Sequence, residues 1–337
     1  MSDPRSKRLL FTAITAALSI GLVLAGAEIL LRASGRGPWR LHPIDPAQPV
    51  IFQADPDLGW RHKEGEYRFP RFSPLGRPVR MSFEADGARS TGAGPAAGKG
   101  TIAIVGCSFT EGFAISDDET FAWKLQQRFP SMRVRNHGHG AYGTYQSLLL
   151  LERILSQQPP PVMALYGFYE GHEIRNVATA DWLRMLAMLA RRHVGISVPY
   201  ATLGKDGRIV RHRPEPYPSW PLRESSATIT FLEHGYARLA ARRRSSQREA
   251  VTEQLLLEMK RACAAKGTDF FVVFLFMNAP NRARYSALLR SHEVPFADCA
   301  QPLPPAFRVP GEGHPNERLN AVWAECIAKA IGPRLEL

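Results

Sequence analysis

The sequence predicts an α/β protein, a three-layer α/β/α fold around a central, mostly parallel five-stranded sheet, preceded by an N-terminal transmembrane helix. Three observations predict this. The chain opens with a run of nineteen uncharged, mostly apolar residues, 9–27. Five short apolar segments follow residue 100, and they alternate with longer segments of helical period. A length of 337 residues with 45% hydrophobic residues suits one main domain with extensions.

The N-terminal apolar run is long enough to cross a membrane. As a helix it spans about 28 Å, close to the hydrocarbon thickness of a bilayer. A basic tail, residues 1–8, precedes it and predicts an N-terminus on the cytoplasmic side with the rest of the chain outside. Because apolar residues continue past Glu28, we expect an uncleaved signal-anchor over 9–31. A cleaved signal peptide ending at "AGA" (25–27) is the alternative.

Residues 32–100 read as a linker followed by a β lead-in, with turns in "DPDLGW" and "EADGARST". The main domain is predicted over 101–337. Its strands are expected at 101–105, 132–136, 161–167, 270–276 and 294–298, and its helices at about 119–129, 145–157, 250–266, 281–291 and 317–331. A segment at about 176–248 breaks this rhythm and is interpreted as an insertion that covers or shapes a site.

The composition narrows the classes of partner. The formal charge is +12, and arginines cluster in "RLAARRRSSQR" (238–248), which indicates either anionic surroundings or a solvated helix face. No zinc-finger spacing or aromatic-basic recognition motif is present, so nucleic-acid binding is not expected. The four cysteines lack CxxC pairing, and neither a metal site nor a cofactor is predicted. Either Cys299 and Cys326 staple the last loop to the last helix, or Cys107, Cys263, Cys299 and Cys326 are all free thiols.

Polar residues gather just after four of the predicted strands. These stretches are "GCSFTEG" (106–112), "HGHGAYGTYQ" (137–146), "FYEGHEIRN" (168–176) and "GEGHPNERLN" (311–320). In an open α/β sheet, ligands bind outside the carboxyl ends of the strands, because loops and helix N-termini converge there. We therefore expect a site at this edge of the sheet.

Ser108 is the candidate nucleophile at this edge. A serine hydroxyl needs a base to remove its proton, and the base needs an acid to fix its tautomer. His314, which precedes a helix start, is the candidate base, and Glu312 lies two residues before it. The structural alternatives are a helix cap for Ser108 and a surface-loop residue for His314.

Acyl transfer also needs donors for the oxyanion. The glycine-rich turn with Gly140, Ala141 and Gly143 offers backbone N–H groups, and the amide of Ser108 is a further donor. The side chain of His172 is the other candidate. A plain turn, and a histidine that merely starts a helix, are the alternatives.

The order of these four blocks resembles the SGNH/GDSL hydrolase superfamily, in particular membrane-tethered bacterial members with divergent motif blocks. The resemblance covers residues 101–331. The family has a serine in a "GDSxT"-like first block, a glycine in the second, an asparagine in the third and a "DxxH"-like last block. It implies Ser108 as nucleophile and His314 as general base, with Glu312 as the carboxylate near that base.

The supporting positions depart from the family pattern. Cys107 stands where the family has aspartate, and Ala141 stands where it has glycine. Ala141 keeps a backbone donor if the turn needs no positive φ. His172 replaces the asparagine, so the side-chain donor would be an imidazole. Gly311 stands three positions before His314, where the family has an aspartate.

The resemblance implies a membrane-anchored serine esterase or O-acyltransferase. Its expected substrate is an O-acyl group, most simply acetyl, on an envelope or exported carbohydrate. The expected location is the inner membrane, with a single span and the catalytic domain in the periplasm. The alternatives are a non-catalytic carbohydrate-binding or assembly protein of polysaccharide export, and a lipid-directed esterase or thioesterase. Hydrolysis and acyl transfer, and the oligomeric state, remain open at this point.

Overall fold

The computed structural model describes residues 4–42, 48–92, 98–189 and 196–335. Its centre is a five-stranded sheet in the order β11-β10-β7-β5-β6, with every neighbouring pair parallel. The strands are β5 (Thr101–Gly106), β6 (Arg133–Gly138), β7 (Met163–Tyr169), β10 (Asp269–Phe276) and β11 (Phe296–Asp298). Each lies within two residues of its predicted range. The predicted α/β class and its five-stranded parallel sheet are confirmed.

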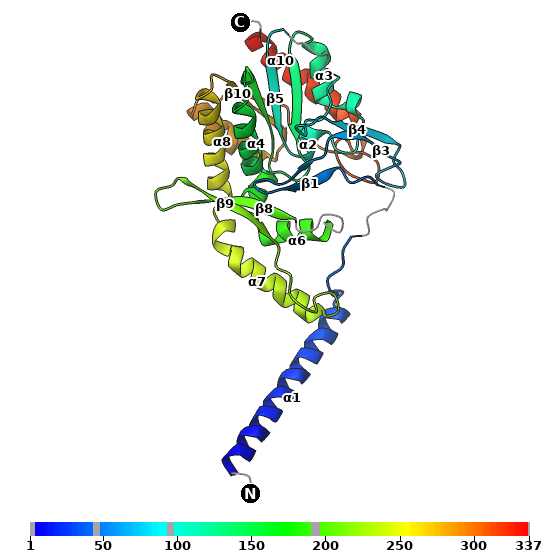
Figure 1. The fold of residues 1–337 in the computed structure, drawn as a ribbon, viewed down its shortest axis with the longest axis vertical. Coiled ribbons are helices and arrows are strands. Elements are labelled where there is room, and N and C mark those ends of the chain that lie inside the picture. Colours follow the sequence, from blue (N-terminus) through cyan, green and yellow to red (C-terminus); the bar gives the residue numbers. More distant parts are fainter. Residues whose placement is uncertain (1–3, 43–47, 93–97, 190–195, 336–337) are drawn as a thin grey trace.

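Helices cover both faces of this sheet (Figure 1). Alternate residues of each strand point to opposite faces. On one face Ala103 and Val105 pack in a cluster with residues of α4, α8 and α9. On the other, Ile102 and Ile104 pack in a second cluster with residues of α3 and α10. Burial on both faces explains why the strands read as continuous apolar runs.

The helices of these layers begin and end close to their predicted positions. They are α3 (Phe121–Arg128), α4 (Thr144–Leu155), α8 (Arg248–Ala264), α9 (Ala279–Ser291) and α10 (Glu317–Leu335). Local capping fixes two of the starts. The Thr120 hydroxyl accepts a hydrogen bond from the Trp123 amide at 3.1 Å, and the Asn278 side chain accepts one from the Asn281 amide at 2.9 Å.

Residues 48–92 fold into two antiparallel hairpins that pack on the core. Their strands are β1 (Phe52–Asp55), β2 (Gly59–His62), β3 (Gly65–Phe69) and β4 (Val79–Phe83). Asp55 forms a two-pronged ion pair with Arg153 of α4, at 2.8 and 2.9 Å. Backbone bridges join Arg89 to Phe83 and to Asn136 of β6. These contacts hold the β strands of the lead-in against the domain.

In the segment predicted as an insertion, the described residues, which leave out 190–195, form one hairpin and two longer helices. Its elements are α6 (Ala180–Leu189), β8 (Ser197–Leu203), β9 (Ile209–Pro216) and α7 (Ala227–Ser245), and α5 (His172–Asn176) precedes them. Two short 3₁₀ turns complete the described chain, η1 (Asp117–Glu119) and η2 (Pro305–Phe307). Ser226 caps the start of α7, and its hydroxyl accepts a hydrogen bond from the Ile229 amide at 3.2 Å.

The apolar N-terminal run lies in one helix, α1 (Pro4–Ala33), which projects from one end of the molecule (Figure 1). Within 5–33, an 18-residue stretch has a mean hydropathy of 2.2 and none of that stretch is buried. The helix is therefore long and apolar enough to cross a membrane; a signal sequence has the same properties. The C-terminus lies at the opposite end. The helix α7 lies between α1 and the rest of the domain, with α6 beside it (Figure 1).

Candidate active site

Ser108 is the first residue of a short helix, α2 (Ser108–Glu111), directly beyond β5. The helix rests against the ends of the neighbouring strands. A Cβ atom on Gly138 would lie 2.3 Å from the Glu111 nitrogen, and one on Gly167 would lie 2.2 Å from Thr110 Oγ1. Only glycine permits so close an approach at these positions. The Ser108 hydroxyl is thereby placed at the carboxyl edge of the sheet.

A buried arginine holds the far end of α2. The Arg89 guanidinium donates to the carbonyl oxygens of Glu111 at 2.9 Å and Ile115 at 2.5 Å, and it pairs with Asp117 at 3.0 Å. The Asn136 amide adds a bond to the Thr110 carbonyl at 3.0 Å. Cys107, at the N-cap, makes no side-chain capping bond. The turn is therefore stabilised from its C-terminal side, with no carboxylate at position 107.

The structure brings Ser108, His314 and Glu312 together in one chain of contacts. His314 Nε2 lies 2.9 Å from Ser108 Oγ, and its Nδ1 lies 2.6 Å from Glu312 Oε1. The second carboxylate oxygen of Glu312 accepts the His314 backbone N–H at 2.8 Å. One carboxylate thus orients both the ring and the backbone of His314. The three residues predicted as nucleophile, base and orienting acid thus lie within hydrogen-bond reach of one another.

The loop that carries His314 is fixed by contacts inside and outside it. Within the loop, the Val309 amide donates to the His314 carbonyl at 2.7 Å. From the lead-in layer, the Ser73 hydroxyl donates to the Pro310 carbonyl at 2.6 Å. The Phe113 ring lies 5.0 Å from the imidazole. These contacts hold the ring at Ser108 without burying it, and its side chain stays 28% exposed.

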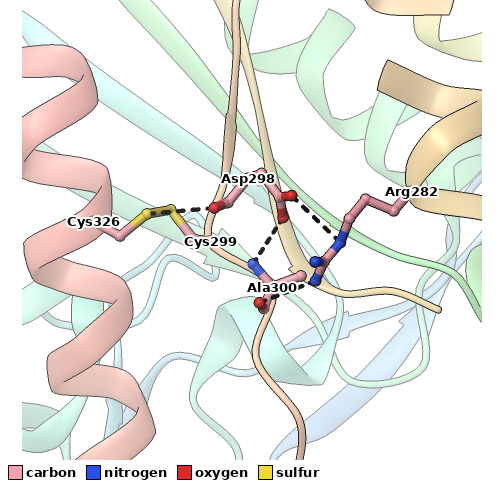
Figure 2. Close-up of a disulfide and its surroundings, with 5 residues drawn as sticks. All are labelled: Arg282, Asp298, Cys299, Ala300 and Cys326. Carbon is pink, nitrogen blue, oxygen red and sulfur yellow. Dashed lines mark hydrogen bonds and ion pairs between the residues drawn. A yellow bond between two sulfur atoms is a disulfide. The ribbon is translucent and has the colours of Figure 1, made fainter. Parts of the chain in front are cut away.

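A disulfide closes the segment that contains this loop. Cys299, just after β11, is bonded to Cys326 of α10 (Figure 2). Beside it, the Asp298 carboxylate pairs with Arg282 at 3.3 Å and accepts the Ala300 amide at 3.3 Å. Of the two alternatives left by the sequence, the stapled one is present, while Cys107 and Cys263 are free and buried. Both Glu312 and His314 lie inside the closed loop.

The glycine-rich turn after β6 lines the same cavity as Ser108. It is closed by the Tyr142 amide donating to the His139 carbonyl at 3.2 Å, and Ala141 has a φ of 69°. The expectation that this turn needs no positive φ at Ala141 is therefore wrong. A residue with a Cβ atom at such a φ lowers the stability of the fold by about 1 kcal/mol or more. The indole N–H of Trp60 donates to the Gly140 carbonyl at 3.1 Å.

That indole contact sets the orientation of the Gly140–Ala141 peptide. In a trans peptide the C=O and N–H groups point in opposite directions. Because the Gly140 oxygen faces Trp60, the Ala141 N–H faces away from it. Within the described part of the chain this amide has no hydrogen-bond partner. Ala141 thus remains a candidate oxyanion donor, together with the amide of Ser108.

Two other predicted donors are placed elsewhere. Gly143 is the N-cap of α4, where its carbonyl accepts the Ser147 hydroxyl at 2.9 Å, and a Cβ there would meet Asn176 Oδ1 at 2.6 Å. Close packing explains this glycine. His172 is fully buried, its Nδ1 lies 2.6 Å from the Tyr166 hydroxyl, and it is not among the residues that line the cavity. The expectation that His172 donates to the oxyanion does not fit this placement.

A group of buried histidines lies behind the turn. The His62 and His139 rings stack at 4.1 Å, and burial lowers the pKa of each to about 3. His62 Nε2 lies 3.2 Å from Glu111 Oε1. Burial raises the pKa of Glu111 to about 7, although Arg89 opposes the shift. The two histidines are therefore neutral near pH 7 and make a neutral interior directly under α2, beside the Glu111 carboxyl group.

The site opens into a cavity of about 720 Å³. Ser108, Glu312 and His314 lie on its wall, and the rest of the lining is mainly apolar. The lining includes Val50, Phe52, Trp60 and Phe113 from one side and Trp182, Met185, Leu186, Leu189 and Ile196 from the other. Arg175 also lines it, with its guanidinium 4.5 Å from the Trp182 ring and an N–H donated to the Tyr142 carbonyl at 2.9 Å.

Sequence reasoning missed several residues that build this site. Arg89, Ser73 and Trp60 lie in the lead-in, and Arg175 follows the third block. Their partners are distant in sequence, up to 237 residues away for Ser73. The only local signal is the position of Trp60 and Arg89 within or beside turn motifs. Nothing in a single sequence connects such turns with the strand ends they support.

Comparison with known proteins gives matches at the level of solved structures. No family model and no curated protein matches this sequence. A member of the lipolytic protein G-D-S-L family from Veillonella parvula has 11% identity and a TM-score of 0.40, covering 69% of this chain and 98% of that one. A putative lipolytic protein of the G-D-S-L family from Desulfitobacterium hafniense has 12% identity and a TM-score of 0.39, covering 68% and 98%.

A third solved structure is the psychrotrophic esterase EstA from a Pseudoalteromonas species, with 11% identity and a TM-score of 0.40, covering 71% of this chain and all of that one. Identities and TM-scores at this level carry no argument about activity, which rests on the geometry of the site itself. The solved structures to which this chain is similar thus include lipolytic G-D-S-L proteins, the family that its sequence blocks resemble.

Proposed function

We propose that this chain is a serine hydrolase or acyltransferase that acts on ester bonds, with Ser108 as nucleophile. One observation carries the proposal. Ser108, His314 and Glu312 form a continuous chain of contacts, 2.9 and 2.6 Å long, on the wall of a 720 Å³ cavity. Such a chain activates a hydroxyl that is otherwise a poor nucleophile.

The reaction would proceed in two halves. Ser108 Oγ attacks the acyl carbonyl while its proton moves to His314 Nε2, and Glu312 stabilises the resulting imidazolium through Nδ1–H. The tetrahedral intermediate then expels the alcohol, which takes that proton, and leaves an acyl group on Ser108. In the second half His314 deprotonates a water or an acceptor alcohol, whose oxygen attacks the acyl carbonyl. The bond to Ser108 Oγ then breaks, Oγ takes the proton back from His314, and the acyl group leaves as the free acid or as a new ester.

The negative charge of the tetrahedral intermediate needs donors. The Ser108 amide and the Ala141 amide are the proposed pair, because both residues line the cavity and the Trp60 indole fixes the Ala141 peptide. In this proposal the imidazole of His172 has no part. Arg175 adds a positive charge to the cavity wall and stabilises an anionic group bound there.

Two substrate classes are proposed for this machinery. The first, from the resemblance, is an O-acetyl group on an envelope or exported carbohydrate. The second is an ester or thioester with a longer acyl chain, and the aromatic and aliphatic cavity wall favours it. Each buried methylene contributes about 0.8 kcal/mol, so a chain that fills the cavity gains affinity with length.

The proposed location is a membrane, with α1 as the anchor and the domain outside the cytoplasm. The disulfide Cys299–Cys326 supports an oxidising compartment, since such bonds are rare in the cytosol. The basic residues before the apolar run support an N-in orientation. Cell fractionation tests this. The full-length chain should stay in membranes after a carbonate wash, whereas a soluble chain beginning near Glu28 would identify a cleaved signal.

A fluorophosphonate probe and an ester series test the proposed chemistry. The probe should label the wild-type chain at Ser108 and leave Ser108→Ala unlabelled. Equal labelling of both would remove Ser108 as nucleophile, and no labelling of either would favour the non-catalytic binding protein. Comparison of p-nitrophenyl acetate, butyrate and octanoate then separates the substrates. A kcat/KM at least about tenfold higher for octanoate supports the acyl-chain class, and a preference for acetate supports the first.

A further inference from the structure

A second cavity, of about 810 Å³, lies where α1 meets α6 and α7. We call it the basic cavity. Its lining comes from the end of α1, from residues 35–40, and from the two helices of the 176–248 segment. Five arginines line it: Arg32, Arg36, Arg40, Arg184 and Arg238. It is separate from the cavity at Ser108, and no residue lines both.

Carboxylates neutralise only part of this charge. Arg32 pairs with Glu28 at 2.6 Å, and Arg238 pairs with Asp181 at 3.1 Å. Among the described residues, Arg36, Arg40 and Arg184 have no carboxylate within ion-pair distance; two of them lie over aromatic rings instead. The basic cavity therefore carries an excess of positive charge that an anion would balance.

Buried donors without partners face this region. Trp39 lines the cavity and is only 3% exposed, yet its indole N–H has no hydrogen-bond partner in the described structure. The ring is held between Tyr217, at 5.5 Å, and the Arg223 guanidinium, at 4.3 Å. The buried Nε of Arg184 also lacks a partner. A buried donor without an acceptor is costly, and a ligand oxygen would satisfy it.

The cavity lies at a defined height along α1. The Glu28 carboxylate accepts the backbone N–H groups of Ala227 at 2.9 Å and Thr228 at 2.8 Å, and the Ser226 hydroxyl at 2.8 Å. It thereby caps α7 and fixes that helix to α1. Exposed apolar side chains of α1 lie on both sides of this cap, with Leu24 one helical turn before it and Ile29 and Leu30 directly after it, just ahead of Arg32.

The surface around the cavity also suits a bilayer. Phe231 and Leu239 of α7 are 51% and 70% exposed; the Arg36 guanidinium lies over the Phe231 ring at 5.7 Å, and Leu239 directly follows Arg238. Apolar side chains beside arginines are typical of helices at the boundary between acyl chains and headgroups. If α1 crosses a membrane, the basic cavity is at the level of the lipid headgroups.

From these contacts we propose that the basic cavity binds the phosphate group of an anionic membrane lipid. The guanidinium groups of Arg36, Arg40 and Arg184 would bind the phosphate oxygens, because arginine presents several donors in one plane. The Trp39 indole N–H supplies a further donor. The lipid would act as a bound structural partner that fixes the domain on the bilayer, independently of any chemistry at Ser108.

Native mass spectrometry of the full-length chain in detergent tests this proposal. The probes are phosphatidylglycerol and phosphatidylcholine of identical acyl composition. The test variant is Arg36→Gln/Arg40→Gln, at two exposed positions of the cavity. The control variant, Arg71→Gln/Arg208→Gln, removes the same charge at exposed positions outside it. The wild type and the control should retain phosphatidylglycerol, and the test variant should bind it about tenfold or more weakly.

Three outcomes would contradict the proposal. Both lipids contain a phosphodiester, and only phosphatidylglycerol has a net negative headgroup. Equal binding of the two lipids by the wild type would therefore show that the net negative charge of an anionic lipid is not recognised. An equal loss of binding in the test and control variants would show that the net charge of the protein, and not the basic cavity, determines lipid binding. Displacement of phosphatidylglycerol by equimolar glycerol phosphate would identify a site for soluble phosphates and remove the lipid from the proposal.

Discussion

Two regions at the same edge of the sheet hold histidines in opposite ways. In the loop 309–316, His314 is partly exposed, faces a serine hydroxyl and has a carboxylate on its other nitrogen. In the interior, His62, His137 and His139 near α2 and His172 at the start of α5 are almost fully buried, and burial lowers the pKa of every one of them. Both His172 and His314 follow predicted strands in the sequence, so position relative to a strand does not distinguish them. What distinguishes a candidate catalytic ring is a serine and a carboxylate as partners, together with access to solvent.

The largest expected effect comes from the exposed region. His314→Ala removes the proposed base, so we expect kcat/KM for any Ser108-dependent ester cleavage to fall by about 10⁴-fold or more. Steady-state kinetics with a p-nitrophenyl ester measures it. Because the two residues act as a unit, adding Ser108→Ala should lower the rate little further. A drop below tenfold in a folded variant would remove His314 from the mechanism.

The next effect concerns the Cys299–Cys326 disulfide, which closes the segment that carries His314. The disulfide spans 27 residues of sequence, and in the chain-entropy treatment a closed loop of this size stabilises the folded state by about 3.5 kcal/mol. Cys299→Ser/Cys326→Ser should lower the free energy of unfolding by that order, measured by urea denaturation in detergent. Adding a reductant to the wild type should give a similar loss. If a reductant lowered the free energy of unfolding but the double substitution did not, the stabilisation would not come from this disulfide.

The third effect tests the neutral interior through Glu111. Its folded pKa of about 7 exceeds the value of 4.5 expected when unfolded. Between these pH values the unfolded chain loses a proton that the folded chain keeps, so the contribution of this group to stability falls as pH rises, by up to about 3 kcal/mol. Glu111→Gln stays neutral and should be more stable than the wild type at pH 8, with the gap closing near pH 4.5. Parallel stability curves from pH 4.5 to 8 would contradict this.

The smallest expected effect on catalysis comes from His172→Ala. The ring contacts Tyr166 inside the core and does not line the cavity. We expect kcat/KM to change by less than about threefold, while the free energy of unfolding falls by about 2 kcal/mol through lost packing and a lost hydrogen bond. Kinetics and denaturation of the same sample separate the two. A loss of about 10²-fold in turnover with unchanged stability would restore His172 as an oxyanion donor.

The sheet was predictable because its strands are buried on both faces, which makes apolar runs such as 101–105 visible in the sequence. That Ser108 and His314 would lie at the same edge of the sheet was also predictable, because the carboxyl ends of parallel strands converge there. The role of position 172 did not follow, because block order gives a residue's neighbourhood but not the direction of its side chain. A turn of the backbone after Gly171 places that ring in the core and Arg175 at the cavity wall.

The pairing of the cysteines and the contacts made by the lead-in could not be predicted from the sequence, because both depend on residues that are far apart in the chain. The sequence left Cys299 and Cys326 as one of two possibilities, and only the proximity of β11 to α10 decides it. Arg89, Ser73 and Trp60 act on atoms that are far away in the chain, and no local period marks them. Helices and strands, which leave a periodic pattern in the sequence, were predicted. Single side chains that stabilise the site through long-range contacts leave no such pattern and were not.

The buried position of Arg89 decides where the chain can be divided. A fragment that begins at β5 keeps Ser108, Glu312 and His314 and all five strands of the sheet, and on topology alone it looks like a complete catalytic unit. Without Arg89, however, it would leave the Glu111 and Ile115 carbonyls and the Asp117 carboxylate without this donor, at about 1 kcal/mol or more for each. It would also lose the Trp60 bond to the Gly140 carbonyl in the turn after β6. An autonomous piece of this protein therefore has to include the hairpins of β1 to β4 together with Arg89.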